Sequence, residues 1–211
     1  MSGIKVKICG MTNAEDARAA VEAGADALGF LCYKKSPRYI EPEVIKQIVA
    51  GLPPFVLPVG IFVNEEAKTV RDLMDACGLA IAQLHGDESG AFCESLGRPV
   101  LRAIRLRDRG SLLQLAEYRG RAGVRGFVID AYSKGTYGGT GHTVDWDIAR
   151  EAAQAAPVLL AGGLTPLNVG EAIKKVRPYG VDVSSGVEVS PGRKDHDKVR
   201  DFVRAVRLVT L

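Results

Sequence analysis

Several residues able to handle protons or anions stand at the ends of short apolar segments. Cys9 closes KVKIC, His85 closes AIAQLH and Asp130 closes GFVID. A thiolate serves as a nucleophile or removes a proton from carbon, and a carboxylic acid donates one. The four cysteines show no CxxC pairing or metal-ligand spacing, so we expect no zinc and a reduced, cytoplasmic compartment.

The first segment indicates how Cys9 is placed. Because side chains alternate along a strand, Lys5, Lys7 and Cys9 share one face, while Val6 and Ile8 share the other and should face helices. A neighbouring cation and the start of the following helix both favour a thiolate at Cys9. The alternative is an inert, packed cysteine.

We expect different roles for the two aspartates Asp130 and Asp182. Asp130 shares a face with Val128, and at the rim of an apolar sheet it suits a general acid, although a loop-capping aspartate is the alternative. Lys7 and Asp182 become inward-facing neighbours if the sheet closes, and we expect them to pair because either charge buried alone is costly. Asp182 would then line the substrate site in a structural role.

Two glycine- and serine-containing turns suit an anion. Gly162 and Gly163 follow the segment VLLA, and Ser184, Ser185 and Gly186 follow GVDV. Glycines let backbone N–H groups approach phosphate oxygens, and hydroxyls donate further bonds. We therefore expect a phosphate site, with plain tight turns as the alternative.

Elements of two kinds alternate along the chain and would position these residues. Apolar segments typical of strands and helical patterns follow one another at spacings near 25 residues. Expected strands span residues 4–8, 25–31, 55–63, 79–86, 99–104, 123–132, 158–163 and 179–186. Expected helices span residues 12–24, 42–52, 65–78, 87–97, 110–118, 144–154, 165–176 and 195–208, the first opened by a capping box from Thr12 to Glu15.

This alternation predicts a single (β/α)8 TIM barrel, with a parallel eight-stranded sheet, as one domain over residues 1–211. An open doubly wound sheet would show a GxGxxG turn after its first strand, and CGMTNAE is not one. In such barrels the active site lies at the carboxyl ends of the strands, where Cys9, His85 and Asp130 stand.

The net charge and its distribution limit the classes of partner that this chain is expected to bind. The formal charge is +3 and the lysines and arginines are scattered, which argues against nucleic acid and suits an anionic small molecule. Neither a signal-peptide pattern nor a stretch of about 18 apolar residues is present, so we expect no membrane association. We expect a monomer, with a homodimer as the alternative.

The segment AYSKGTYGGTGHTVDW, residues 131–146, is long for a compact chain. Loops of this length are usually functional, and its glycines permit a hinge motion that excludes water. Tyr132, Tyr137 and Trp146 argue against plain disorder. We therefore expect a lid over the site.

Several of these segments together resemble one family. KICGMTNAEDA, KSPRYI, FVNE, QLHGDE, YGGTGHTVDW, AGGLTPLNV and DVSSGVEVSPGRKDH, in this order, are similar to phosphoribosylanthranilate isomerase of tryptophan biosynthesis. The resemblance covers nearly the whole chain. It implies an Amadori rearrangement of a phosphoribosyl substrate without cofactor or metal.

The resemblance also implies roles. Cys9 matches the general base, Asp130 the general acid and Arg38 the arginine that holds the anthranilate carboxylate, while His85 is expected to line the substrate. Cys32 and the Lys34-Lys35 pair stand before the second loop, where the resemblance leads us to expect a more apolar or proline-containing segment. Two alternatives stay open: a related aminoaldose isomerase of histidine biosynthesis, whose family has aspartate where this chain has Cys9, and a non-catalytic phosphate-binding barrel.

Overall fold

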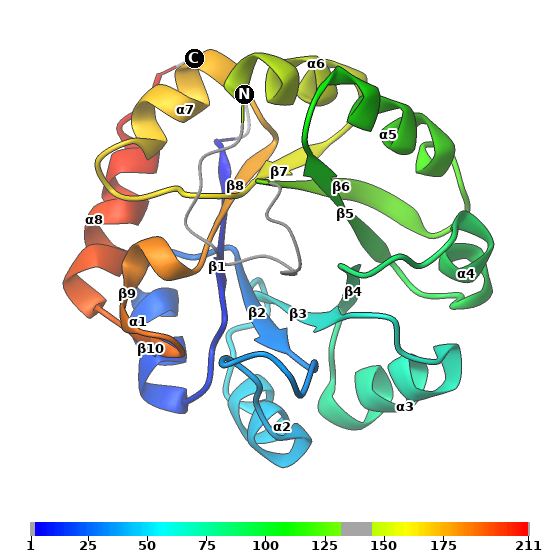
Figure 1. Cartoon of the computed structure of the whole chain (residues 1–211). Helices are drawn as coiled ribbons and strands as arrows, with labels where there is room; N and C mark the ends of the chain where they lie inside the picture. The colour runs from blue at the N-terminus through cyan, green and yellow to red at the C-terminus, as the bar shows by residue number, and fades with distance from the viewer. Residues whose placement is uncertain (1–2, 132–144, 211) are drawn as a thin grey trace.

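A computed structural model describes residues 3–131 and 145–210. Eight parallel strands close into a barrel in which each pairs with the next and β8 pairs with β1. They lie at the centre of the molecule (Figure 1). Their bounds are β1 Lys5–Cys9, β2 Ala27–Leu31, β3 Leu57–Phe62, β4 Ile81–Leu84, β5 Val100–Leu106, β6 Val124–Ala131, β7 Val158–Leu160 and β8 Gly180–Val183.

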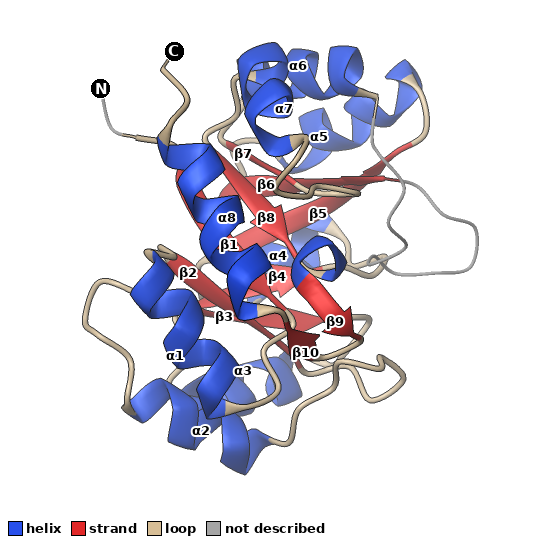
Figure 2. Cartoon of the chain, turned by 90° about the vertical axis from the view of Figure 1, so that its left-hand side faces the viewer, coloured by secondary structure: helices blue, strands red, loops and turns tan. Residues whose placement is uncertain are grey.

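Helices surround the barrel and connect consecutive strands, as the alternation in the sequence predicts (Figures 1 and 2). Their bounds are α1 Ala14–Ala23, α2 Pro42–Ala50, α3 Ala67–Cys77, α4 Gly90–Ser95, α5 Leu112–Tyr118, α6 Trp146–Ala155, α7 Val169–Val176 and α8 His196–Arg207, with 3-10 turns η1 Arg109–Ser111 and η2 Ser185–Val187. The predicted (β/α)8 barrel is confirmed.

Two separate apolar layers hold the barrel together. Val6 and Ile8 are fully buried in the larger layer, which fills the space between strands and helices. Val128 and Leu159 belong to a small inner cluster within the barrel. The alternation expected for β1 and β6 is therefore confirmed, and the residues that share a face with Val128 point inward.

The first helix begins one residue later than expected. Asn13, and not Thr12, is the N-cap of α1, because its side chain accepts the backbone N–H of Asp16. The Thr12 hydroxyl instead donates to the Gly192 carbonyl. The predicted capping box is wrong because this long-range bond removes Thr12 from the helix start.

A small hairpin follows the barrel strands and was not expected from the sequence. β9 (Glu188–Ser190) pairs antiparallel with β10 (Arg193–Lys194), and Gly192 adopts a φ of 79° in the turn. The hairpin lies beyond the carboxyl end of β8 (Figure 2). It brings Glu188 and Lys194 toward the rim of the barrel.

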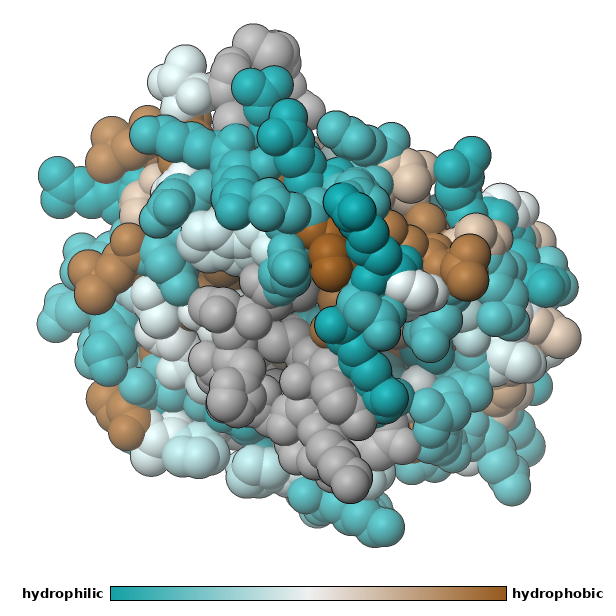
Figure 3. All heavy atoms as spheres, turned by 45° about the horizontal axis from the view of Figure 1, so that its top comes forward, coloured by the Kyte–Doolittle hydropathy of each residue, from teal (hydrophilic) through white to brown (hydrophobic). Residues whose placement is uncertain are grey.

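Over the described residues, no helix combines the length and apolar character that crossing a membrane requires. Hydrophilic side chains cover most of the face seen in Figure 3, with hydrophobic ones in separate small groups. Of the predicted lid, residues 132–144 lie outside the described residues. Trp146, at the start of α6, packs against the main core.

Candidate active site

The closed barrel gathers the predicted residues at one end. Cys9 is the last residue of β1, Asp130 stands next to the end of β6, and Ser184 directly follows β8. Because all barrel strands are parallel, these positions lie on the same carboxyl rim. His85, which directly follows β4, joins them there.

Cys9 is tightly enclosed by two glycines. A Cβ atom added at Gly29, its neighbour across the β1–β2 pair, would lie 2.8 Å from Cys9 Sγ. One added at Gly10, where φ is 80°, would lie 2.8 Å from Arg38 Cδ and 3.0 Å from Ser184 Oγ. These glycines therefore allow the thiol, the guanidinium and the β8 loop to approach one another.

Below Cys9, Lys7 pairs with Asp182 as the sequence predicts. Lys7 Nζ lies 2.8 Å from Asp182 Oδ2, and both side chains are buried. Asp182 Oδ1 is also buried and forms no hydrogen bond within the described part of the chain. Asp182 thus neutralises Lys7 and keeps one acceptor available.

Lys7 acts to lower the pKa of the Cys9 thiol, as expected from the sequence, but this effect is outweighed. Burial raises the pKa of the Cys9 thiol above its ordinary value. The charges of Lys7 and Lys194 act to lower that pKa, but Asp182 opposes them, and burial dominates. This burial depends on contacts across the closed barrel, which the sequence alone does not reveal.

His85 and Asp130 form a second buried group on the rim. His85 Nε2 lies 3.6 Å from Asp130 Oδ2, and its Nδ1 lies 3.2 Å from Gln83 Nε2. His85 Nε2 is buried and forms no hydrogen bond within the described residues, so its contact with Asp130 is a close approach of the two side chains. The imidazole therefore lies where it can orient Asp130.

The two expected phosphate loops lie against each other. Gly162 and Gly163 have φ angles of 82° and 64°, and a Cβ added at Gly186 would lie 1.8 Å from the Leu164 carbonyl oxygen. Only glycine fits at position 186. Ser184 Oγ is buried and has no hydrogen-bond partner in the described residues.

Arg38 lies close to the same rim, beside Gly10. Its guanidinium forms a two-bond ion pair with Glu188, with Nε 2.9 Å from Oε1 and Nη2 2.7 Å from Oε2. Lys194 Nζ lies 2.8 Å from Glu188 Oε1. Sequence reasoning missed Glu188 and Lys194, although a Pro-Gly turn between two short segments is a hairpin signal.

The other three cysteines belong to the packed interior. Cys77 ends α3 and Cys93 lies in α4, as predicted, and both are buried. Cys32 is buried just after β2, and burial raises its pKa to about 12. These thiols are therefore packed as small apolar side chains.

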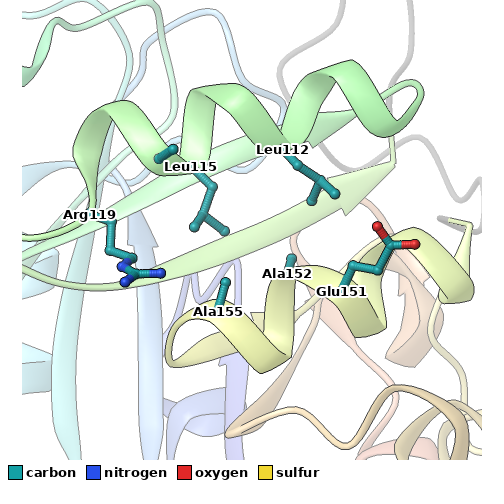
Figure 4. Close-up of a pocket in the computed structure, with 7 residues that line it drawn as sticks. Leu112, Leu115, Arg119, Glu151, Ala152 and Ala155 are labelled. Atoms are coloured by element: carbon teal, nitrogen blue, oxygen red, sulfur yellow. The ribbon is translucent and has the colours of Figure 1, made fainter.

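A hollow on the outer surface lies between α5 and α6 (Figure 4). Leu112, Leu115 and Ala152 give it an apolar floor, and Arg119 and Glu151 stand at its edges. It contains none of the rim residues.

Together the fold and the rim define a (β/α)8-barrel protein with proton-transfer groups and glycine–serine loops at the carboxyl ends of its strands. The sequence profile of the N-(5'phosphoribosyl)anthranilate (PRA) isomerase family matches residues 6–205. The chain belongs to this family of isomerases of tryptophan biosynthesis, which confirms the resemblance noted in the sequence.

Individual relatives agree over nearly full length. The N-(5'-phosphoribosyl)anthranilate isomerase of Trichlorobacter lovleyi is 55% identical, covering 95% of this chain and 97% of the relative. That of Pelobacter propionicus is 52% identical, covering 97% and 96%. The crystal structure of phosphoribosyl anthranilate isomerase from Thermotoga maritima superposes with a TM-score of 0.89 at 40% identity, covering 97% and 98%.

Proposed function

We propose that this chain converts N-(5-phosphoribosyl)anthranilate to 1-(2-carboxyphenylamino)-1-deoxyribulose 5-phosphate by general acid and base catalysis, with Asp130 as the acid and Cys9 as the base. Family membership supports the reaction. A structural neighbour with a TM-score of 0.85 and 40% identity was solved in complex with reduced 1-(o-carboxyphenylamino)-1-deoxyribulose 5-phosphate, which supports the ligand class.

The two anionic ends of this substrate suit two parts of the rim. We assign the phosphate to Gly162, Gly163, Ser184, Ser185 and Gly186. Their loops lie in contact and include the buried Ser184 hydroxyl, which has no hydrogen-bond partner among the described residues. Backbone N–H groups at such glycine turns bind phosphate oxygens.

We assign the anthranilate carboxylate to Arg38. A planar guanidinium binds a carboxylate through paired hydrogen bonds. The sugar would then lie between the two anion sites, over Cys9. His85 and Asp182 would line the cavity, the first beside the acid and the second beneath the base.

Asp130 carries out the first step. Its carboxylic proton passes to the ribose ring oxygen while the C1–O bond breaks and the anilino nitrogen lone pair forms the C=N bond of a protonated Schiff base. The imidazole of His85 lies 3.6 Å from Asp130 Oδ2, close enough to interact electrostatically with the carboxyl group. Proton transfer by a placed side chain contributes about 100- to 10,000-fold.

Cys9 carries out the second step. Its thiolate takes the C2 proton, and the electrons of the C–H bond form the C1=C2 double bond of an enolamine and neutralise the nitrogen. Protonation at C1 and loss of the C2 hydroxyl proton then give the ketone. Because burial raises the pKa of Cys9, the thiolate is the minor form at neutral pH, and this minor form is the base.

One observation carries this proposal. Arg38 and Ser184 meet at Gly10, the residue that follows Cys9, where a single added carbon would contact both side chains. The base, the carboxylate-binding group and the phosphate loop are therefore within reach of one small molecule. Cys9 and Arg38 are buried, and so is the Ser184 Oγ atom.

A fluorescence assay that follows the disappearance of freshly generated phosphoribosylanthranilate tests the proposal. Cys9→Ser and Asp130→Asn should each lower kcat/KM by about 100-fold or more. Cys77→Ser, which retains a hydrogen-bond donor to the Pro42 carbonyl, and exposed Asp75→Asn serve as controls and should retain full activity. Unchanged turnover in either site variant would disprove the assigned mechanism.

A further inference from the structure

The Arg38–Glu188 ion pair uses a particular edge of the guanidinium. Glu188 accepts from Nε and Nη2 of Arg38, at 2.9 and 2.7 Å. Nη1 forms no hydrogen bond with any described residue. A guanidinium offers two edges for a carboxylate, one formed by Nε and Nη2 and one by Nη1 and Nη2. Glu188 therefore occupies the Nε–Nη2 edge and leaves the Nη1–Nη2 edge for another carboxylate.

Glu188 is itself fixed to the rim by other bonds. Its Oε1 accepts from Lys194 Nζ at 2.8 Å and from the Gly192 backbone N–H at 3.3 Å. Lys194 Nζ also lies 2.5 Å from the Cys9 carbonyl oxygen and 3.4 Å from that of Ser184. A continuous set of bonds thus connects the guanidinium to the backbone beside the proposed base and the phosphate loop.

The positive and negative charges of Arg38, Glu188 and Lys194 do not cancel. Arg38 and Lys194 are cations and Glu188 is the anion between them, so the formal sum is +1. Burial acts to raise the pKa of Glu188, but hydrogen bonds from Arg38 and the charge of Lys194 outweigh it and lower that pKa. Burial lowers the pKa of Lys194. The cluster is therefore complementary to one further negative charge.

We propose that Glu188 is a positioning residue that holds Arg38 by its Nε–Nη2 edge so that the Nη1–Nη2 edge receives the carboxylate on the aromatic ring of the substrate. This inference rests on the proposed function. Glu188 would contact no reacting atom. It would act through Arg38 alone and set the preference for a carboxylated ring.

A purely structural role for Glu188 is the competing explanation, because Glu188 begins the β9–β10 hairpin. The two roles differ in one measurable respect. Loss of a hairpin anchor would weaken the binding of any ligand at the rim. Loss of guanidinium positioning would weaken only ligands that carry the ring carboxylate.

Calorimetric titration with two probes separates these roles. The first probe is reduced 1-(o-carboxyphenylamino)-1-deoxyribulose 5-phosphate, and the second is the same compound without the carboxylate. Glu188→Gln should lower the affinity for the first probe by about 10-fold or more and for the second by less than about 2-fold, because the guanidinium is no longer held by a two-bond ion pair at its Nε–Nη2 edge. Glu188→Asp should give a smaller loss in the same pattern.

Two further variants complete the test. In an Arg38→Ala background, Glu188→Gln should cause no additional loss of affinity, because its effect requires the guanidinium. Glu151→Gln, in an exposed ion pair on α6, is the control and should bind both probes normally.

Equal losses for both probes, or a full additional loss in the Arg38→Ala background, would overturn the inference while leaving the proposed function in place. If neither probe binds the unsubstituted protein, the proposed function fails, and the inference fails with it.

Discussion

Four charged groups surround the Cys9 thiol and determine its protonation. Lys7 lies below it on β1, Asp182 on β8, Lys194 on β10 and Arg38 beyond β2. Because Lys7 is bound to Asp182, its charge does not overcome the effect of burial on the thiol. If a ligand donates a hydrogen bond to Asp182 Oδ1, the Asp182 carboxylate will neutralise the charge of Lys7 less completely.

These contacts predict the pH dependence of Cys9. Since burial raises its pKa, the thiolate fraction is small at neutral pH, and alkylation by iodoacetamide should increase with a midpoint above the ordinary thiol value of about 8.5. Asp182→Asn should move the midpoint to lower pH by removing the opposing charge. Lys7→Met should move it to higher pH.

Peptide mapping by mass spectrometry would measure this reaction at Cys9, with buried Cys32 and Cys77 as internal references. If Asp182→Asn leaves the midpoint unchanged or raises it, the carboxylate does not control the thiol. A higher midpoint in Lys7→Met together with a lower one in Asp182→Asn is the pattern that only the charge explanation gives.

At the level of elements, periodicity in the sequence was sufficient for the barrel but not for the hairpin. Each barrel strand is a short, mostly apolar segment followed by a helical pattern, which indicates its type locally. Glu188–Ser190 and Arg193–Lys194 are too short to show periodicity. The partner of Glu188, Arg38, is 150 residues away, so only the closed fold reveals the contact.

Asp16 shows how such long-range contacts join elements. Its carboxylate accepts from the Lys194 backbone N–H at 2.9 Å, pairs with His196 Nε2 at 2.8 Å and accepts from Asn13 Nδ2 at 2.8 Å. It therefore joins α1 to β10 and to the start of α8. The sequence could place Asp16 on a helix but not show these partners.

We predict that Asp16→Ala lowers the free energy of unfolding by about 2–3 kcal/mol at pH 7, because buried donors lose their acceptor. Burial acts to raise the Asp16 pKa, but the bonds from Lys194 and His196 lower it below the ordinary value. A lowered folded-state pKa gives stability that is present above the unfolded value of about 3.9 and disappears as pH falls through the folded value.

Urea unfolding of both proteins between pH 7 and pH 3 would measure this contribution. The difference between them should be constant near neutrality and shrink below about pH 4. Asp72→Ala removes an exposed pair with Lys68 and should change stability by about 0.5 kcal/mol or less. A difference that does not vary with pH would show that the Asp16 carboxylate charge is not the source.

For the whole molecule, closure of the barrel depends on how β1 meets β8. Lys7 and Asp182 are direct partners in the register of this pair, and their ion pair lies inside the closed sheet. The sequence predicts this contact because closure makes the first and last strands neighbours and both side chains face inward. Both side chains are buried, so removing one charge leaves the other buried without its ion-pair partner.

Removing one charge should therefore destabilise the barrel much more than removing both. We predict that Lys7→Met and Asp182→Leu each lower the free energy of unfolding by about 3–5 kcal/mol, whereas the double variant recovers most of that loss, because well-packed apolar side chains replace a buried ion pair with little net change. Chemical denaturation of the four proteins gives the coupling energy. The exposed Lys68–Asp72 pair, substituted in the same way, should show a coupling of about 0.5 kcal/mol or less. Additive losses at Lys7 and Asp182 would contradict the prediction and would mean that each side chain stabilises the barrel through contacts other than their ion pair.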